Sequence, residues 1–206
     1  MLFYIFRHAP TLANEQGLIL GATDPPATEQ GLAAFADLAQ VLARTLPPTV
    51  PVHVFSSPLV RAQASARILA QALGAPLELV VGLGELAAGV YEGRLRREAL
   101  PLGRPLRQTW ADRPCGGESM ADAEQRVAEA LAQMRRVANQ GAALLVGHAV
   151  VNRVLVKLLS GWPDADLLRF VHPHDAMLLA RPDQTMSWLD AEGRSGAGLP
   201  GKEPRS

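Results

Sequence analysis

Short apolar runs that stop abruptly at polar or charged residues are the feature that most limits how this chain can fold. Three such runs are Leu2–Phe6, Val52–Phe55 and Ala142–Val146. The first is followed at once by Arg7-His8 and the last by Gly147-His148. Runs of this length are typical of buried strands, and polar residues at strand ends are where active-site loops of α/β proteins begin. We therefore expect both histidines at one edge of a sheet.

Helical periodicity fills the stretches between these strands. Helices are predicted from Thr28, as the cap, to about Leu46, at Leu59–Leu73, at Met120–Asn139 after a Ser119 cap, and at Val150–Leu159. The core stripe of the third helix is expected to be Val127, Ala130, Leu131, Met134 and Val137. Further strands are predicted at Leu77–Val81, Ala176–Ala180 and Thr185–Leu189. This alternation predicts an α/β fold, a three-layer αβα sandwich with a mostly parallel central sheet.

Length and composition limit the domain organisation and the partners. The chain has 206 residues, 48% of them hydrophobic, and 20 basic against 20 acidic side chains. We expect a single domain over residues 1–190 and a disordered tail over 191–206, which is rich in Gly, Pro, Ser and charge. Neutral charge argues against nucleic acid or anionic membrane as a partner. The single Cys115 excludes an internal disulfide, and no apolar stretch approaches the ~20 residues that span a bilayer, so we expect a cytoplasmic location.

The residues near the strand ends suit a phosphate group. A phosphate monoester carries about two negative charges and needs fixed donors. Arg7, Arg61, Asn14 and the backbone N–H groups at the start of the helix at Val150 can supply them. Arginine suits this task better than lysine, because its planar fork binds two oxygens and stays charged. With two histidines beside them, these donors describe a site for a phosphate that is transferred to nitrogen.

Six motifs occur in the order found in a known family. They are Arg7-His8-Ala9 with Asn14; Gly21, Asp24, Pro26, Thr28 and Gly31; Ser56–Ala62; Leu83, Glu85, Gly89 and Tyr91-Glu92-Gly93; Gly116–Ser119; and Gly147-His148. By this order, over roughly residues 2–190, the chain resembles the histidine phosphatase superfamily, also called phosphoglycerate mutase-like. The resemblance implies the phosphoglycerate mutase-like version of the αβα sandwich.

The resemblance also implies a role for each matched residue. By it, His8 is the nucleophile, which forms a phosphohistidine that water then hydrolyses. Glu85 would donate a proton to the leaving oxygen and later take one from water. The implied catalytic set is His8, Glu85, His148, Arg7 and Arg61, and the implied phosphate-binding set is Arg7, Asn14, Arg61, His148 and Ala149. No metal and no cofactor is implied, because the arginines and the second histidine take the place of a cation.

Several positions have more than one interpretation. Ala9 stands where the family has glycine, and Pro10 removes a backbone donor, so the first loop departs from the family pattern while we expect activity to survive. Three acids lie close in sequence, and spacing alone does not rank them. We expect Glu92 to stabilise its loop and Glu118 to cap a helix or pair with an arginine, which leaves Glu85 as the acid.

The segment from Gly82 to Gly117 and the pair His172 and His174 are expected to lie around the site. We interpret the two histidines as loop residues before the last strands, at the pocket mouth, in preference to a metal site. The covering segment contains a basic cluster, Arg94, Arg96, Arg97, Arg104 and Arg107. A solvated helix face is the first interpretation of this cluster, and substrate selection is the second.

Three functions remain in competition. The first is a metal-independent phosphomonoesterase acting on a small phosphorylated metabolite, in the short branch that includes α-ribazole phosphatases and broad-specificity phosphatases. The second is a phosphoglycerate mutase, although mutases of the family carry a large insertion where only about two dozen residues separate Gly93 from Gly117 here. The third is a non-catalytic phosphate-binding module. The particular substrate and the oligomeric state do not follow from the sequence.

Overall fold

A seven-stranded sheet forms the centre of the computed structural model, which describes residues 1–100, 104–138 and 141–200. Its strands, in spatial order, are β3 (Leu77–Leu79), β2 (Val52–Ser56), β4 (Ala142–Gly147), β1 (Leu2–Arg7), β5 (Ala176–Ala180), β6 (Met186–Asp190) and β7 (Ser195–Ala197). The pairs among β3, β2, β4 and β1 are parallel, and the pairs from β1 through β5 and β6 to β7 are antiparallel. The sheet is therefore mixed: three of its six strand pairs are parallel, so the expectation of a mostly parallel sheet holds only for the part from β3 to β1.

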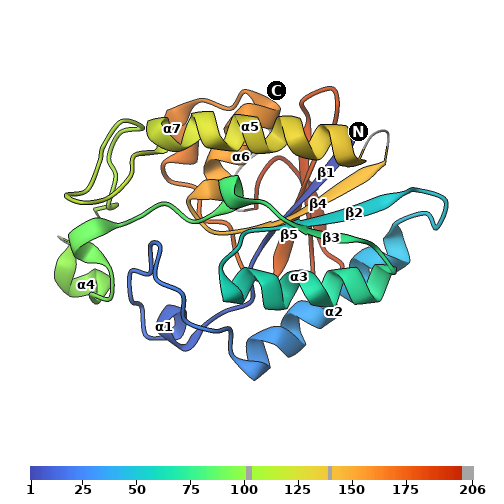
Figure 1. The fold of residues 1–206 in the computed structure, drawn as a ribbon, viewed down its shortest axis with the longest axis horizontal. Helices are drawn as coiled ribbons and strands as arrows, with labels where there is room; N and C mark the ends of the chain where they lie inside the picture. Colours follow the sequence, from blue (N-terminus) through green and yellow to red (C-terminus); the bar gives the residue numbers. More distant parts are fainter. Residues whose placement is uncertain (101–103, 139–140, 201–206) are drawn as a thin grey trace.

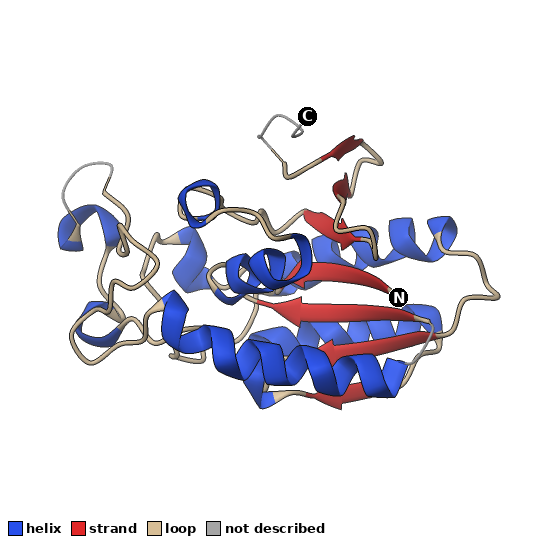
Figure 2. Cartoon of the chain, turned by 90° about the horizontal axis from the view of Figure 1, so that it is seen from above, coloured by secondary structure: helices blue, strands red, loops and turns tan. Residues whose placement is uncertain are grey.

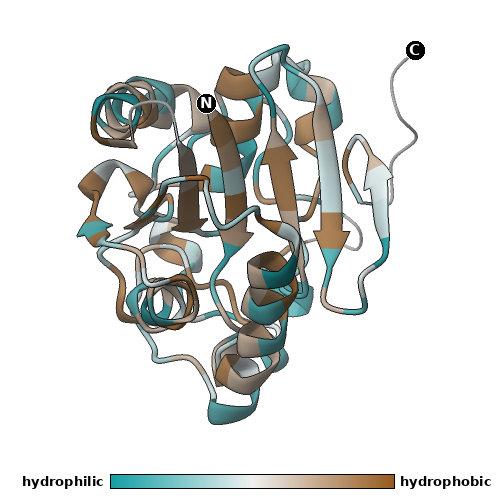
Figure 3. Cartoon of the chain, turned by 90° about the vertical axis from the view of Figure 1, so that its right-hand side faces the viewer, coloured by the Kyte–Doolittle hydropathy of each residue, from teal (hydrophilic) through white to brown (hydrophobic). Residues whose placement is uncertain are grey.

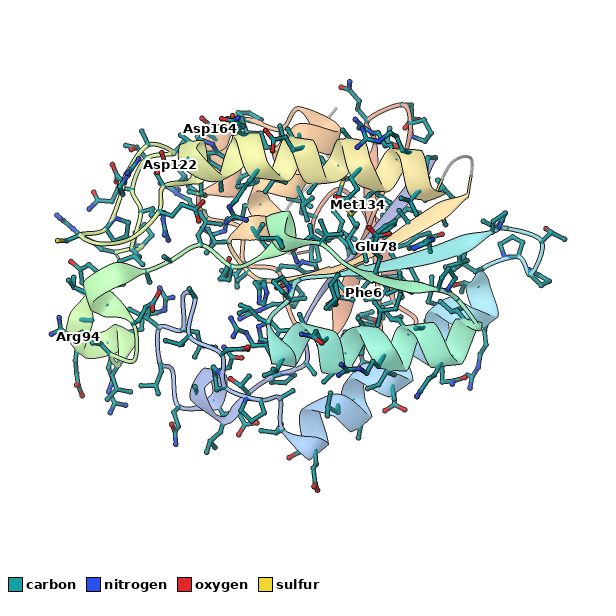
Figure 4. All side chains as sticks on the ribbon, in the orientation of Figure 1. Phe6, Glu78, Arg94, Asp122, Met134 and Asp164 are labelled. Atoms are coloured by element: carbon teal, nitrogen blue, oxygen red, sulfur yellow. The ribbon has the colours of Figure 1, made fainter. Side chains whose placement is uncertain are left out.

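Helices cover both faces of the sheet (Figure 1). On one face lie α2 (Glu29–Thr45) and α3 (Val60–Leu73), and on the other α5 (Met120–Ala138) and α6 (Val151–Ser160). Figure 4 places Met134 between α5 and the sheet, and Phe6 on the opposite side toward α3. Side chains of β1 alternate between the two cores, because successive residues of a strand point to opposite faces. The three-layer αβα architecture is confirmed.

The central strands are the most apolar elements, whereas strands at the edge of the sheet and the helices are mixed in hydropathy (Figure 3). The Thr28 hydroxyl accepts a hydrogen bond from the Gly31 N–H at 3.0 Å and so caps α2 as predicted. In α5, the prediction is wrong at Val137, which is 42% exposed, whereas Ala138 is buried. The next inward position after Met134 is four residues on, because the helix repeats every 3.6 residues.

The C-terminal segment is not the tail that composition suggests. Residues Ser195–Ala197 pair with β6, the Gly198 N–H donates to the Met186 carbonyl at 2.8 Å, and Leu199 is fully buried. The expectation of disorder is wrong for residues 191–200, and residues 201–206 lie outside the described residues. The physical reason is that an open sheet edge offers backbone donors and acceptors to any extended segment, whatever its side chains.

Loops and short helices lie together at one end of the sheet, as Figure 2 shows. They include α1 (Leu12–Glu15), the short helices at Val81–Leu83 and Gly89–Tyr91, α4 (Arg96–Ala99) and α7 (Asp164–Leu167). Backbone hydrogen bonds join residues 17–19 to residues 93–96, so the segments holding α1 and α4 form one cover. Within the described ranges, no helix is long and apolar enough to cross a membrane.

Candidate active site

The register of β1 and β4 brings the two histidines together. Arg7 lies opposite Gly147, and the His8 N–H donates to the Gly147 carbonyl at 3.0 Å. His8 and His148 directly follow these parallel strands, so they share the carboxyl edge of the sheet. Their ring centroids are 5.0 Å apart, and both side chains are buried. This juxtaposition agrees with the sequence prediction.

The tautomer of His8 follows from its hydrogen bond. Its Nδ1 lies 2.7 Å from the Ala9 carbonyl oxygen, which can only accept, so Nδ1 carries the proton. Nε2 therefore holds an unshared electron pair. Burial lowers the pKa of His8 well below its ordinary value, and electrostatic interactions with His148, Arg61 and Arg7 lower it further. The ring is thus neutral near pH 7, as a nucleophilic nitrogen must be.

Arg7 and Arg61 bring positive charge to the same place from two segments. Arg7 donates from Nη1 to the His172 carbonyl at 2.9 Å, and burial lowers its pKa to about 10, so it remains charged. Arg61 is 1% exposed and donates to the carbonyls of Thr23 at 2.5 Å and Gly21 at 3.2 Å. These bonds fix both guanidinium groups, while the buried Nε of each has no protein partner among the described residues.

Glu85 holds the start of α6. Its carboxylate accepts hydrogen bonds from the N–H groups of Val150 at 3.0 Å, Val151 at 2.9 Å and Leu86 at 3.0 Å. A carboxylate at a helix N-terminus is stabilised by the orphan N–H groups and by the helix dipole. The sequence analysis expected the N–H groups at the start of this helix to bind phosphate. In the structure they instead donate hydrogen bonds to the Glu85 carboxylate.

The other two acids have structural partners. Glu92 accepts hydrogen bonds from the N–H groups of Ala22 at 2.9 Å and Ala88 at 2.8 Å, and so joins two loops. Glu118 forms a two-bond ion pair with Arg126, at 2.8 Å for each bond. Both observations agree with the roles expected from the sequence. Of the three acids, Glu85 is the one that lines the cavity described next.

A cavity of about 490 Å³, hereafter the first cavity, opens at this edge of the sheet. Its walls include Arg7, His8, Asn14, Arg61, Glu85 and Ala149, all predicted from the sequence. His148 is not on the wall: it is fully buried behind His8, with its Nε2 2.8 Å from the Ser57 hydroxyl. Direct contact of His148 with phosphate remains a prediction. Asn14 also closes the α1 capping box, its Oδ1 accepting from the Thr11 N–H at 3.1 Å.

The first cavity is also lined by Arg153, which the sequence analysis did not place in the site, and by His174, which it expected at the pocket mouth. Arg153 comes from the first turn of α6 and donates to the Leu168 carbonyl at 3.1 Å. His174 donates from Nδ1 to the His8 carbonyl at 2.6 Å, and the two rings are 5.3 Å apart. Arg153 follows His148 by about one helical turn, so its position in the sequence could have indicated that it lies in the same site. His174 lies in a loop whose path no local pattern fixes.

The remaining ambiguous residues have defined positions. His172 is fully buried, accepts from the Asn152 amide at Nδ1 and donates to the Ala176 carbonyl. Within the described chain, no three His, Cys, Asp or Glu side chains are grouped to hold a metal ion. Arg107 is buried and donates to the Glu118 and Ala87 carbonyls, so the solvated-face interpretation is wrong for it. In contrast, Arg94 is exposed at the outer end of the cover (Figure 4).

The departures at Ala9 and Pro10 cause no strain. Ala9 does not have a positive φ, since Gln184 is the one non-glycine residue of the described chain that does. The Ala9 N–H donates to the Ser65 hydroxyl at 2.8 Å, and the Pro10 carbonyl accepts from the Thr28 N–H at 2.9 Å. The first loop is therefore anchored on both sides.

Gly147 is required by close packing against the start of α6. A Cβ at this position would lie 2.4 Å from Oδ1 of Asn152, whose amide nitrogen donates to the Phe6 carbonyl and to His172. We expect Gly147→Ala to destabilise the fold by about 1–3 kcal/mol, because the buried amide must move. Urea unfolding measures this loss. Gly84→Ala is the control, with its nearest contact at 3.3 Å; equal stabilities of the two variants would contradict the prediction.

Stability should fall in mildly acidic solution. Burial lowers the pKa of His172 to about 3 and of His174 to about 4, and lowers the pKa of His8 and His148 as well. Below pH 6.5 these histidines are protonated in the unfolded chain but remain neutral in the folded chain. The free energy of unfolding therefore decreases as the pH falls from 6.5 toward the lowered pKa values. The loss is about 1.4 kcal/mol per pH unit for each such histidine. Urea titrations at pH 7.5, 6 and 5 test this; a flat profile would contradict it.

The fold and the site together define an α/β protein that presents a neutral, buried histidine to an arginine-lined cavity. The sequence pattern of the histidine phosphatase superfamily (branch 1) matches residues 3–188. The chain therefore belongs to the histidine phosphatase superfamily. The resemblance drawn from the motifs is confirmed.

Relatives and solved structures agree with this assignment. The probable phosphoglycerate mutase GpmB of Enterobacter sp. (strain 638) is 36% identical over 165 residues, which cover 78% of this chain and 75% of the relative. A mycobacterial glucosyl-3-phosphoglycerate phosphatase has a similar fold, with a TM-score of 0.73 at 21% identity over 96% of this chain and 97% of that chain. A putative alpha-ribazole-5'-P phosphatase from Escherichia coli gives a TM-score of 0.71 at 22% identity, covering 97% and 95%. The phosphoglycerate mutase-like fold is confirmed.

Proposed function

We propose that this protein is a metal-independent phosphomonoesterase that hydrolyses a small phosphorylated metabolite in the cytoplasm. The observation that carries the proposal is the state of His8. Its Nδ1 proton is held by the Ala9 carbonyl, its ring is neutral, and it lies in the first cavity with Arg7 and Arg61. A lone-pair nitrogen beside two fixed cations is suited to attack a phosphorus atom that carries anionic oxygens.

The reaction has two steps. In the first, Nε2 of His8 forms a bond to phosphorus while the bond from phosphorus to the ester oxygen breaks, and Glu85, which enters this step in its protonated form, gives the leaving oxygen its proton. In the second, water attacks phosphorus, the N–P bond breaks, and Glu85 takes a proton from the water. His8 and Glu85 then return to their starting states, with inorganic phosphate and an alcohol as products.

Charge stabilisation comes from the protein itself. Arg7 and Arg61 lie on the wall of the first cavity, and Arg153 adds a third guanidinium group there. Such groups stabilise the phosphoryl oxygens throughout the transfer, and this electrostatic contribution is usually the largest in phosphoryl transfer. In this proposal, Asn14 and Ala149 contribute neutral contacts to the phosphate, and His148, whose ring lies beside that of His8, also binds a phosphoryl oxygen.

Release of inorganic phosphate tests the proposal. The purified protein should hydrolyse 4-nitrophenyl phosphate and a panel of phosphorylated metabolites in the presence of EDTA. Activity that appears only when a divalent metal is restored would contradict metal independence. The panel also shows which metabolite is hydrolysed fastest. This must be measured, because neither the fold nor the family determines the substrate.

The second candidate is a phosphoglycerate mutase, because curated relatives carry that name. A mutase would return the phosphoryl group from His8 to its product instead of to water. The short segment between Gly93 and Gly117 favours hydrolysis, since less chain is present to exclude water from the phosphohistidine. A coupled assay that measures isomerisation and phosphate release together separates the two; isomerisation far faster than release would favour the mutase.

A further inference from the structure

A second cavity of about 1120 Å³ adjoins the first. Both cavities share wall residues, Glu15, Gly17, Arg96, Pro105 and Arg153. The second cavity is lined by α4 with its flanking residues and by α7 with the residues that follow it, and His8 is not on its wall. A molecule whose phosphate occupies the first cavity can therefore extend past Arg96 and Arg153 into the second.

The second cavity is strongly positive in a protein whose net charge is zero. Five arginines line it: Arg96, Arg97, Arg104, Arg153 and Arg169. Glu15 is the one acidic residue among the described residues of its wall. The ion pairs found in the described part of the chain involve only Arg97 of these five, at 3.8 Å from the exposed Glu98. Among the described residues, Arg96, Arg104 and Arg169 thus form no ion pair with a carboxylate.

The same cavity has an apolar side. Its apolar residues are Leu95, Leu100, Ala165, Leu168 and Val171. Val171 is 61% exposed, so its side chain is accessible to a molecule in the cavity. A ligand that satisfies both sides combines an apolar body with an anionic group.

We propose that the second cavity binds the far end of the substrate, and that this substrate is an elongated phosphate monoester with an apolar body and a second anion at its other end. The inference rests on the proposed function, because it assigns the reacting phosphate to the first cavity. The second anion is a carboxylate or a second phosphate, since a guanidinium group binds either through two parallel hydrogen bonds. In this proposal Arg97, Arg104 and Arg169 select the substrate and do not take part in the phosphoryl transfer.

A series of linear alkyl phosphates tests the proposal. Chains from ethyl to octyl carry a methyl group, a carboxylate or a second phosphate at the far end. We expect kcat/KM for the anionic members to exceed that of the methyl member by about ten- to a hundredfold at the chain lengths that reach the arginines. The carboxylate and phosphate arms show which anion is preferred, and the preference should weaken as salt is raised.

Variants connect the preference to the cavity. Arg97, Arg104 and Arg169 line the second cavity and not the first, so the triple variant Arg97→Gln/Arg104→Gln/Arg169→Gln should bring the ratio of anionic to methyl kcat/KM close to one. Arg44→Gln, at the end of α2 and on neither wall, is the matched control and should keep the ratio. A methyl member hydrolysed as well as the anionic members at every length overturns the inference while the proposed function stands. No turnover of any member rejects both.

Discussion

Replacement of His8 by alanine should abolish phosphate release. We expect His8→Ala to lower kcat/KM by roughly 10⁴-fold or more, because the variant has no nitrogen to accept the phosphoryl group. The rate is measured with 4-nitrophenyl phosphate and with the best metabolite from the panel. Folding should persist, since the lost side chain makes its hydrogen bond to its own neighbour, Ala9.

Two controls make this result specific. His53→Ala removes a histidine on β2 that lies outside both cavities, where it stacks on Phe55, and it should retain activity. The wild-type protein, quenched in alkali because phosphohistidine is acid-labile, should carry a phosphoryl group on His8. Turnover retained in His8→Ala would reject the nucleophile. Phosphate binding by the wild type without any adduct or turnover would favour the non-catalytic module.

Replacement of Glu85 by glutamine should produce a loss that depends on the leaving group. We expect Glu85→Gln to slow hydrolysis of an alkyl phosphate by about 10²- to 10⁴-fold, because an alkoxide needs a proton as it departs. The loss should be much smaller with 4-nitrophenyl phosphate, whose phenolate leaves without protonation. A plot of kcat/KM against leaving-group pKa measures this difference, and the slope should be steeper for the variant.

Glu118→Gln and Glu92→Gln are the matched controls for this experiment. Glu118 is bound to Arg126 and Glu92 to two loop N–H groups, and neither lines the first cavity. Their loss should reduce stability without changing the dependence on the leaving group. If either control steepened that slope and Glu85→Gln did not, the proton donor would have been assigned to the wrong acid.

One carboxylate, that of Glu85, interacts with several arginines of the site. Glu85 interacts electrostatically with Arg7, Arg61, Arg107 and Arg153, and its charge favours the charged form of each. These four guanidinium groups would otherwise repel one another across a buried site. The carboxylate thus lies at the centre of the positive charge, which is also where the leaving oxygen must gain a proton and the attacking water must lose one in the proposed reaction.

The sequence by itself determined the strands, the main helices and the position of His8. These features depend on residues close together in the chain: apolar runs set the strands, and caps such as Thr28 set the helix starts. Because parallel strands align their carboxyl ends, the residues after β1 and β4 had to meet. The motif order added Arg7, Arg61 and Glu85 to this edge, and all three line the first cavity.

Tertiary structure alone decided which residues surround that edge. The sequence analysis chose Glu85 through the family resemblance, but the partners of Glu85, Glu92 and Glu118 are groups far apart in sequence that no local pattern specifies. His174 reached His8 through a loop with no periodic pattern. The strand at Ser195–Ala197 formed because β6 left a backbone edge open, which composition does not record. Local patterns encode the elements, but contacts between loops depend on where the completed sheet places them.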